Sequence, residues 1–151
     1  MSQPFPLQPL LDLSQDRLDD ATRDLGQRVA REQEGTRKLE MLQRYRNEYE
    51  ARFRDAVRDG IGVEAWRNYS AFMARIDEAI AAQRAQVEAS QRHTAAGKEV
   101  WVQQRNRVKA FDTLHVRHRT SEERKLAKAE QRLSDEHAAN RHRLADETDA
   151  V

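Results

Sequence analysis

The chain has 151 residues, enough for one domain, and 35% of them are charged while only 38% belong to the hydrophobic set. A chain this polar lacks the apolar surface for a thick globular core, so it must stay disordered or concentrate its hydrophobic residues along narrow seams. The 27 basic and 26 acidic residues are balanced and interleaved. This balance argues against a nucleic-acid-binding protein, because such proteins gather a basic excess on one face.

Glycine and proline usage indicates long helices rather than disorder. The three prolines all precede residue 10 and only five glycines occur, whereas disordered chains are usually rich in both and helix interiors exclude them. The N-terminal sequence MSQPFPLQPL lacks the basic flank and long apolar stretch of a secretory signal. No run approaches the ~18 apolar residues of a membrane span, and no cysteine is present for disulfide bonds. We therefore expect a soluble all-α protein, compatible with the cytosol.

The first helix is expected over about residues 10–58, and it ends in the sequence RDGIGVEAW (58–66). Gly60 can adopt the left-handed conformation that ends a helix, and Gly62 permits a second bend. Glu64 suits the positive end of the next helix dipole. We predict a turn at 59–63 and a second helix over 64–117. The whole chain, 1–151, then forms a long two-stranded antiparallel coiled coil, or αα-hairpin, with an extended C-terminal helix.

The second helix has the clearest periodicity, because its seam positions alternate in steps of three and four. A spacing of about 3.5 residues is typical of a left-handed coiled coil. Folding at the turn makes residues whose numbers sum to about 122 face one another. The seam positions are Trp66, Tyr69, Met73, Ile76, Ile80, Gln83, Val87, Ser90, Thr94, Gly97, Trp101, Gln104, Val108 and Phe111.

The charge distribution supports this register. Residues 12–34 hold seven acidic and four basic side chains, a net −3, and the facing residues 88–110 hold five basic and two acidic, a net +3. Opposite flanking charges commonly set pairing and orientation in coiled coils. The middle of the seam is polar, at Gln83, Ser90 and Thr94. We therefore expect a hairpin that is firm near its turn and softer halfway along.

Residues 118–151 have no partner in the first helix, because Leu7 falls opposite about His115. This overhang has only three sizeable hydrophobic residues, Leu126, Leu133 and Leu144. We expect it to fray when alone, since most helical stability comes from tertiary packing. A helix of this kind is either a disordered tail or a segment that becomes ordered within another protein.

A surplus of aromatic residues lies just below the turn, in the sequence MLQRYRNEYEARF (41–53). Tyr45 falls outside the seam, and a two-helix hairpin has no second layer to cover it. Two interpretations stay open: a wider core, or a partner-binding surface of the kind that exposed aromatic patches often mark. The register sets two rows side by side: Leu42, Tyr45 and Tyr49 from the first helix, and Phe72, Ile76, Ala79 and Gln83 from the second.

No pattern for catalysis, metal or cofactor binding stands out. His115 and His118 lie three residues apart and two more histidines lie in the overhang, but a zinc site needs three or four converging ligands. The sequence lacks a Gly-rich phosphate loop and a nucleophile elbow. We therefore expect no catalytic residue, no metal site and no cofactor, and we expect Trp66 and Trp101 to anchor the seam.

Four segments resemble the FliJ family of flagellar type III export proteins. They are LEMLQRYRNEY before the turn, WRNYSAFMARIDEAIAAQ after it, EVWVQQRNRVKAFDTL further along, and LSDEHA in the overhang. The resemblance covers about the whole chain, and the block next to the turn is its most specific part. The equivalent stalk protein of a virulence-type III secretion system and a generic coiled-coil scaffold or spacer remain alternatives.

The resemblance implies a non-enzymatic, rotor-stalk-like part of the flagellar export apparatus. Such a protein binds the hexameric export ATPase and promotes ring assembly, contacts the cytoplasmic domain of the export gate FlhA, and helps recycle export chaperones. It is cytoplasmic and peripherally associated with the inner membrane at the flagellar base, without inserting into the membrane and without binding nucleic acid. The ATPase contact is assigned to the overhang, including Leu126, Leu133, Asp135 and Glu136. The gate contact is assigned to Lys38, Leu42, Tyr45, Tyr49, Phe72, Ile76, Ala79 and Gln83.

Overall fold

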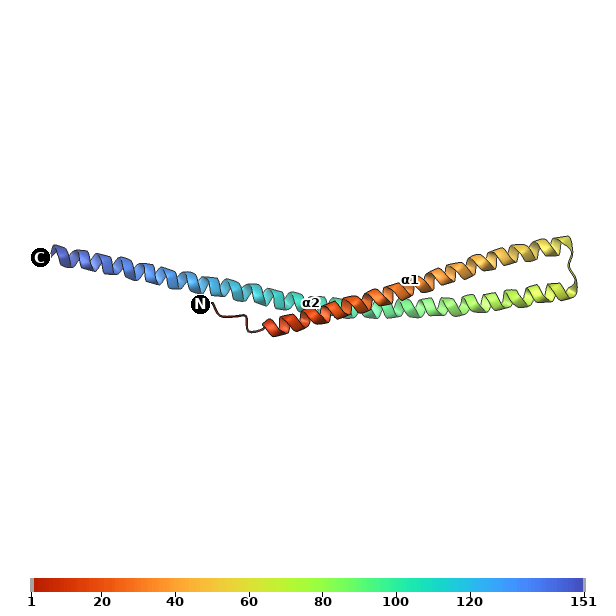
Figure 1. Ribbon diagram of the computed structural model, residues 1–151, viewed down its shortest axis with the longest axis horizontal. Helices are drawn as coiled ribbons and strands as arrows, with labels where there is room; N and C mark the ends of the chain where they lie inside the picture. The colour runs from red at the N-terminus through yellow and green to blue at the C-terminus, as the bar shows by residue number, and fades with distance from the viewer. Residues whose placement is uncertain (1, 151) are drawn as a thin grey trace. The chain divides into compact units, whose positions relative to one another are not determined.

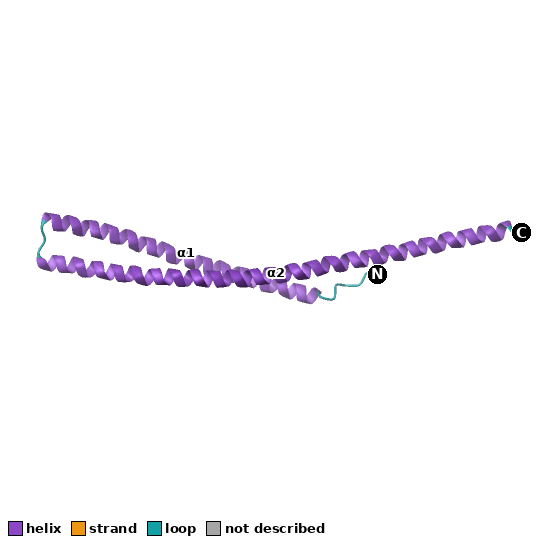
Figure 2. Ribbon diagram, turned by 180° about the vertical axis from the view of Figure 1, so that it is seen from behind, coloured by secondary structure: helices purple, strands orange, loops and turns teal. Residues whose placement is uncertain are grey.

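The computed structural model describes residues 2–150 and has two helices in this part of the chain. Helix α1 runs from Gln8 to Asp59 and helix α2 from Val63 to Asp149, with residues 60–62 between them (Figure 1). Figure 2 shows loop only before α1, at this turn and at the C-terminal end of the described chain. The predicted all-α fold is confirmed. Within residues 2–150, neither helix contains a stretch apolar enough to span a membrane.

The helix bounds follow from proline and glycine placement. Pro4 and Pro6 precede α1, and Pro9 lies in its first turn, where the missing backbone N–H would have had no helical partner. The two helices contribute to two compact units. We call residues 18–104 the hairpin unit, and residues 2–17 with 105–150 the terminal unit.

The turn of the hairpin unit depends on the backbone of Gly60. Its φ angle is +91°, the left-handed region, and its N–H donates to the carbonyl oxygen of Val57 at 3.2 Å. This bond satisfies one of the carbonyl groups left free at the end of α1. The first α2 bond begins at Gly62, whose carbonyl oxygen accepts from the N–H of Trp66 at 3.0 Å. The left-handed conformation predicted for Gly60 is confirmed.

Replacing Gly60 with alanine is expected to lower the free energy of unfolding by about 1–2 kcal/mol, because a Cβ disfavours the left-handed conformation. Gly62 provides the matched control, since its φ lies outside that region and an added Cβ would have no heavy atom within 4 Å. Gly62→Ala should therefore be close to neutral. Urea unfolding followed by circular dichroism measures both variants, and equal losses at the two positions would contradict the role of Gly60.

Contacts between the helices of the hairpin unit confirm the predicted register. The rings of Phe53 and Tyr69 have centroids 5.2 Å apart. Further along, the indole N–H of Trp101 donates to Thr22 Oγ1 at 3.0 Å. The residue numbers of both pairs sum to within one of 122. Predicted seam positions are accordingly the buried residues of α2 in this unit: Ile76, Ile80, Gln83, Val87 and Gly97.

The seam prediction was wrong for Trp66, whose side chain is 51% exposed. The register places it opposite Ala56, and a methyl group is too short to cover an indole ring. Trp66 instead lines an open depression of about 320 Å³ at the turn, together with Val57, Ile61 and Val63. Trp101 behaves differently, because the hydrogen bond from its indole to Thr22 ties it to α1.

Candidate partner-binding surfaces

Five aromatic rings form a ladder below the turn, contributed alternately by α1 and α2. Phe53 contacts Tyr69, Tyr69 contacts Tyr49 with ring centroids 5.4 Å apart, and Tyr49 contacts Phe72 at 4.5 Å. Phe72 then meets the edge of Tyr45, at 6.3 Å and an interplanar angle of 80°. Tilted and edge-on rings at these separations attract one another, by about 0.5–1.5 kcal/mol per pair beyond their burial. The ladder therefore holds the aromatic side chains in defined orientations.

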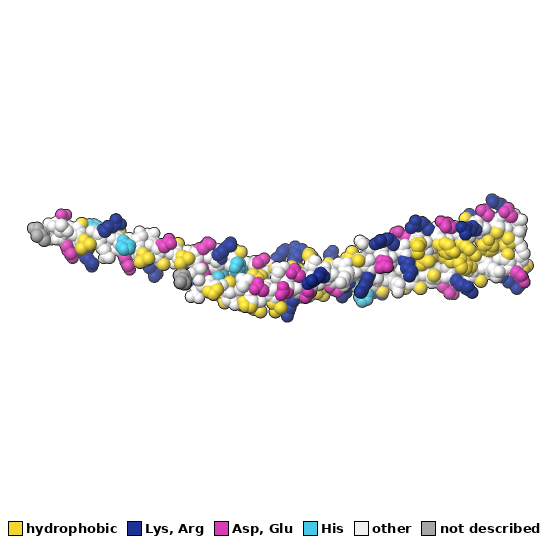
Figure 3. All heavy atoms as spheres, in the orientation of Figure 1, with side chains coloured by type: hydrophobic (Ala, Val, Ile, Leu, Met, Phe, Trp, Pro, Cys, Tyr) yellow, Lys and Arg dark blue, Asp and Glu magenta, His cyan; other side chains and the backbone are white. Residues whose placement is uncertain are grey.

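The structure brings the predicted gate residues together on the hairpin unit, but at different depths. Tyr45 is 44% exposed, and Lys38 and Ala79 are also exposed. Leu42, Tyr49 and Phe72 are half-buried. We call these six residues the aromatic patch. Figure 3 shows hydrophobic side chains gathered over both helices next to the turn.

Ile76 and Gln83 lie beneath the aromatic patch rather than on it. Both side chains are buried between the helices. The amide of Gln83 donates through Nε2 to the carbonyl oxygen of Gly35 at 3.1 Å. A partner protein would therefore not contact these two side chains directly. They affect the surface above them only by filling the seam between the helices. Because the hydrogen bond of Gln83 satisfies a buried polar group, Gln83 supports the register without leaving its nitrogen unpaired.

An ion pair next to the patch escaped the sequence-based prediction. Arg46 Nε donates to Asp77 Oδ1 across the helices at 2.6 Å, and its Nη1 donates to Glu50 Oε2 at 2.9 Å. These carboxylates, Asp77 first, raise the pKa of the Arg46 guanidinium above its ordinary value. The spacing of Arg46 and Glu50 at i, i+4 was a visible signal. Asp77 was recognisable only from the register.

Tyr69 and Phe53 also belong to the ring ladder, although the predicted gate site omitted them. Desolvation among these rings, with smaller contributions from the phenols of Tyr69 and Tyr45, raises the pKa of Tyr49 above its ordinary value of 10.0. The Tyr49 hydroxyl therefore keeps its proton to a higher pH than an ordinary tyrosine does. The i, i+4 spacing of Tyr45, Tyr49 and Phe53 was the signal for the α1 side of the ladder.

The predicted ATPase-binding residues lie on the C-terminal part of α2, in the terminal unit. Leu126 and Leu133 are 41% and 57% exposed. Asp135 and Glu136 are exposed as well, and Asp135 Oδ1 accepts a hydrogen bond from Gln131 Nε2 at 3.0 Å. The structure continues α2 as helix through this region to Asp149. Fraying of the free helix in solution stays a prediction.

No partner in the first helix was expected for residues 118–151, and the structure adds a partner for the first of them from the segment that precedes α1. Residues 2–6, which we call the strap, run along α2 in the terminal unit. The backbone N–H of Gln3 donates to Glu122 Oε2 at 3.1 Å, and the Gln3 carbonyl oxygen lies 2.9 Å from His118 Nε2. An extended chain advances about 3.3 Å per residue against about 1.5 Å in a helix, so a few strap residues reach further along α2 than helical pairing predicts.

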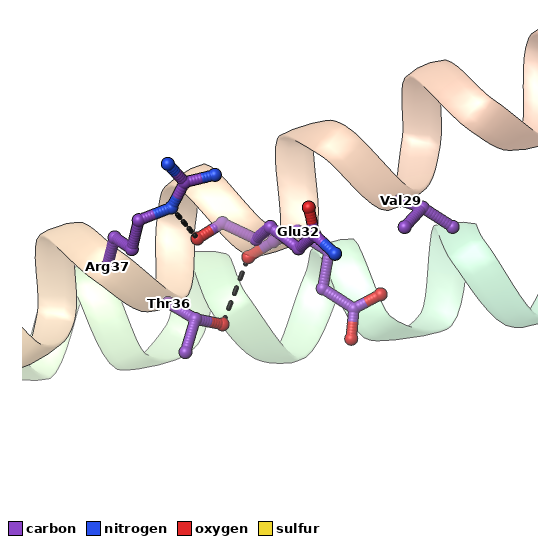
Figure 4. Close-up of a pocket in the computed structure, with 5 residues that line it drawn as sticks. Val29, Glu32, Thr36 and Arg37 are labelled. Carbon is purple, nitrogen blue, oxygen red and sulfur yellow. Dashed lines mark hydrogen bonds between the residues drawn. The ribbon is translucent and has the colours of Figure 1, made fainter.

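A surface depression of about 380 Å³, drawn in Figure 4, is lined by residues that all come from α1. Its Thr36 hydroxyl donates to the Glu32 carbonyl oxygen at 3.0 Å, and Arg37 Nε donates to that of Gln33 at 3.4 Å. Both side chains thus bond within their own helix. Within residues 2–150, no three His, Cys, Asp or Glu side chains are arranged to hold a metal ion.

Several known proteins are similar to this chain in sequence or in structure. A solved structure of a putative YscO homolog from Chlamydia trachomatis aligns over 96% of this chain and 98% of its own, with 16% identity and a TM-score of 0.46. The chain is 31% identical over 117 residues to the flagellar FliJ protein of Salmonella typhi, covering 78% of this chain and 80% of that protein.

The flagellar FliJ protein of Escherichia coli (strain K12) is 29% identical over 121 residues, covering 80% of this chain and 82% of its own length. The family model for the flagellar FliJ protein matches residues 2–147, nearly the whole sequence. The match includes α1, the aromatic patch and α2 as far as residue 147. The chain therefore belongs to the family of flagellar FliJ proteins.

Proposed function

We propose that the protein is a non-enzymatic, stalk-like component of the flagellar type III export apparatus. It binds the hexameric export ATPase and promotes assembly of its ring, contacts the cytoplasmic domain of the export gate FlhA, and helps return export chaperones to service. It acts in the cytoplasm, at the inner-membrane face of the flagellar base. The observation that carries this proposal is the family match over residues 2–147.

The aromatic patch supports a gate contact on physical grounds. Tyr45 keeps 44% of its surface exposed although it packs against Phe72. A few well-oriented aromatic side chains supply most of the binding energy in many protein interfaces. The ring ladder already fixes the orientation of Tyr45 in the free protein. Binding would therefore cost less side-chain entropy than it would for a freely rotating tyrosine.

The C-terminal part of α2 supports an ATPase contact for a different reason. Beyond Glu122 its described side chains are exposed, and its apolar residues Leu126, Leu133 and Leu144 are widely spaced. A charged helix with so narrow an apolar stripe can enter a ring without holding one subunit tightly. Such weak, repeated contacts suit a stalk that must meet all six subunits of a hexamer.

The test is ATP hydrolysis by the cognate export ATPase, with and without this protein, alongside the size of the ATPase assembly. We expect faster turnover and a larger hexamer fraction when the protein is present. A chain truncated after Lys125 should lose both effects while keeping the residues that hold the strap, His118, Glu122 and Lys125. The control is Tyr45→Ala, which should stimulate as the unmodified chain does, because the aromatic patch and the C-terminal part of α2 belong to different units.

Two results would count against this assignment. An unchanged rate and assembly size with the full chain would remove the ATPase role and favour a scaffold or a gate and chaperone adaptor. Full stimulation by the truncated chain would move the ATPase contact to another part of the molecule.

A further inference from the structure

The strap is prevented by its own sequence from joining α1. Gln3 precedes Pro4 and Phe5 precedes Pro6, and a residue before proline is pushed out of the helical region into extended conformations. Proline also fixes its own φ angle. Residues 2–5 accordingly have no regular secondary structure, and α1 begins only at Gln8. The strap is therefore largely extended before it contacts α2, which reduces the conformational entropy lost on docking.

Two side chains one helical turn apart on α2 bind the backbone of a single strap residue. Glu122 Oε2 accepts from the Gln3 N–H at 3.1 Å. His118 Nε2 lies 2.9 Å from the Gln3 carbonyl oxygen, and this nitrogen must carry the hydrogen, since a carbonyl oxygen only accepts. The Gln3 side chain has no part in either bond. This arrangement recognises an extended peptide backbone rather than a particular side chain.

A third contact selects for an aromatic residue two positions later. The ring of Phe5 meets His115 edge-on, with centroids 5.1 Å apart and an interplanar angle of 72°, and lies 5.6 Å from the ring of His118.

Glu122 is only 8% exposed, and its second oxygen, Oε1, accepts from Lys125 Nζ at 3.3 Å. Both oxygens of this buried carboxylate therefore have donors, as a buried charge requires.

We propose that His115, His118 and Glu122 form a binding site for an extended peptide with an aromatic residue, and that residues 2–6 of the same chain occupy it as a releasable strap. These three residues continue the three- and four-residue spacing of the α2 seam beyond Val108 and Phe111. The strap therefore covers the face on which a partner segment would otherwise pack. Its release uncovers that face immediately before the exposed C-terminal part of α2.

The charge on Glu122 keeps the strap closed. The hydrogen bond from the Gln3 backbone, followed by Lys125 and His118, lowers the pKa of Glu122 below its ordinary value of 4.5, and desolvation opposes this only in part. Because the pKa of Glu122 is lower in the closed state, its ionised carboxylate stabilises closure at pH values above 4.5. This stabilisation is lost as the pH falls through the lowered pKa of Glu122. The strap itself carries no titratable side chain, so the titratable groups that face Glu122 are Lys125 and His118, both on α2.

A spin label tests the proposal on the full chain. The chain has no cysteine, so Ser121→Cys, on the exposed surface of α2, provides a single attachment site for a nitroxide. In the closed strap the label should remove most of the intensity of the Phe5 amide signal in an NMR spectrum. Full Phe5 intensity in the otherwise unmodified chain at neutral pH would overturn the proposal.

Substitutions at Gln3 separate backbone recognition from side-chain packing. Gln3→Pro removes the donated N–H and should restore the Phe5 signal, whereas Gln3→Ala keeps the N–H and should leave the signal broadened. Equal behaviour of the two variants would overturn backbone recognition. On α2, Glu122→Ala should restore the signal and the exposed neighbour variant Glu123→Ala should not. Lowering the pH below 4.5 and through the lowered pKa of Glu122 should also restore it with helicity retained, and broadening that persists below that lowered pKa would contradict the role of the Glu122 charge.

Discussion

Replacing Tyr45 or Phe72 with alanine is expected to weaken binding to the cytoplasmic domain of FlhA by about thirtyfold, corresponding to about 2 kcal/mol. Tyr45 is the most exposed ring of the ladder, and Phe72 holds it from the edge. The Tyr45 substitution removes the contact itself, and the Phe72 substitution removes the contact and the support. Affinity is measured by isothermal titration with the purified gate domain.

The stability of each variant decides how this result is interpreted. Each substitution removes two ring pairs, so it should lower the free energy of unfolding by about 1–3 kcal/mol and leave helicity nearly intact. Met41→Ala is the control, because Met41 is an accessible apolar side chain of α1, 57% exposed, outside the aromatic patch. The affinity of this variant for the gate domain should not change. If both ring substitutions unfold the hairpin, the rings are core residues and the wider-core interpretation is correct. If they fold and bind normally, the gate contact lies elsewhere.

Replacing Ile80 with aspartate is expected to lower the free energy of unfolding by more than about 4 kcal/mol. Ile80 is 7% exposed and lies on the seam between the buried side chains of Ile76 and Gln83. The substitution removes about 2–3 kcal/mol of apolar burial and sets an unpaired carboxylate between the helices. Total stabilities of domains are only about 5–15 kcal/mol. The hairpin unit should therefore be largely unfolded at temperatures where the unmodified chain is folded.

Ala81→Asp is the matched control for this prediction. Ala81 is the next residue of the same helix and is exposed. Its substitution should therefore lower the free energy of unfolding only by the difference in helix propensity between alanine and aspartate, about 0.7 kcal/mol. Thermal unfolding followed by circular dichroism compares the two variants. Similar losses at positions 80 and 81 would mean that the seam contributes little and that helix propensity dominates stability.

Much of the fold was predictable because coiled-coil packing repeats with a short period. The spacing of apolar residues from Ile76 to Val87 identified the buried face of α2, and the left-handed Gly60 placed the turn. Once a turn and two seams are known, antiparallel geometry leaves one register, and the contact between Phe53 and Tyr69 agrees with it. The family resemblance rested on the same blocks of sequence and is confirmed by the match over residues 2–147.

The sequence by itself therefore determined the helices, the turn, the register and the rows from which the aromatic patch is built, because each depends on local conformational preference or a short repeat. Only the tertiary structure decided how deeply each side chain lies: Gln83 beneath the patch, Trp66 exposed opposite a small residue, and Arg46 bonded across to Asp77. It alone also revealed the strap on His118 and Glu122. Contacts between residues 119 positions apart depend on an extended segment with no periodicity, and a helical repeat carries no information about where such a segment docks.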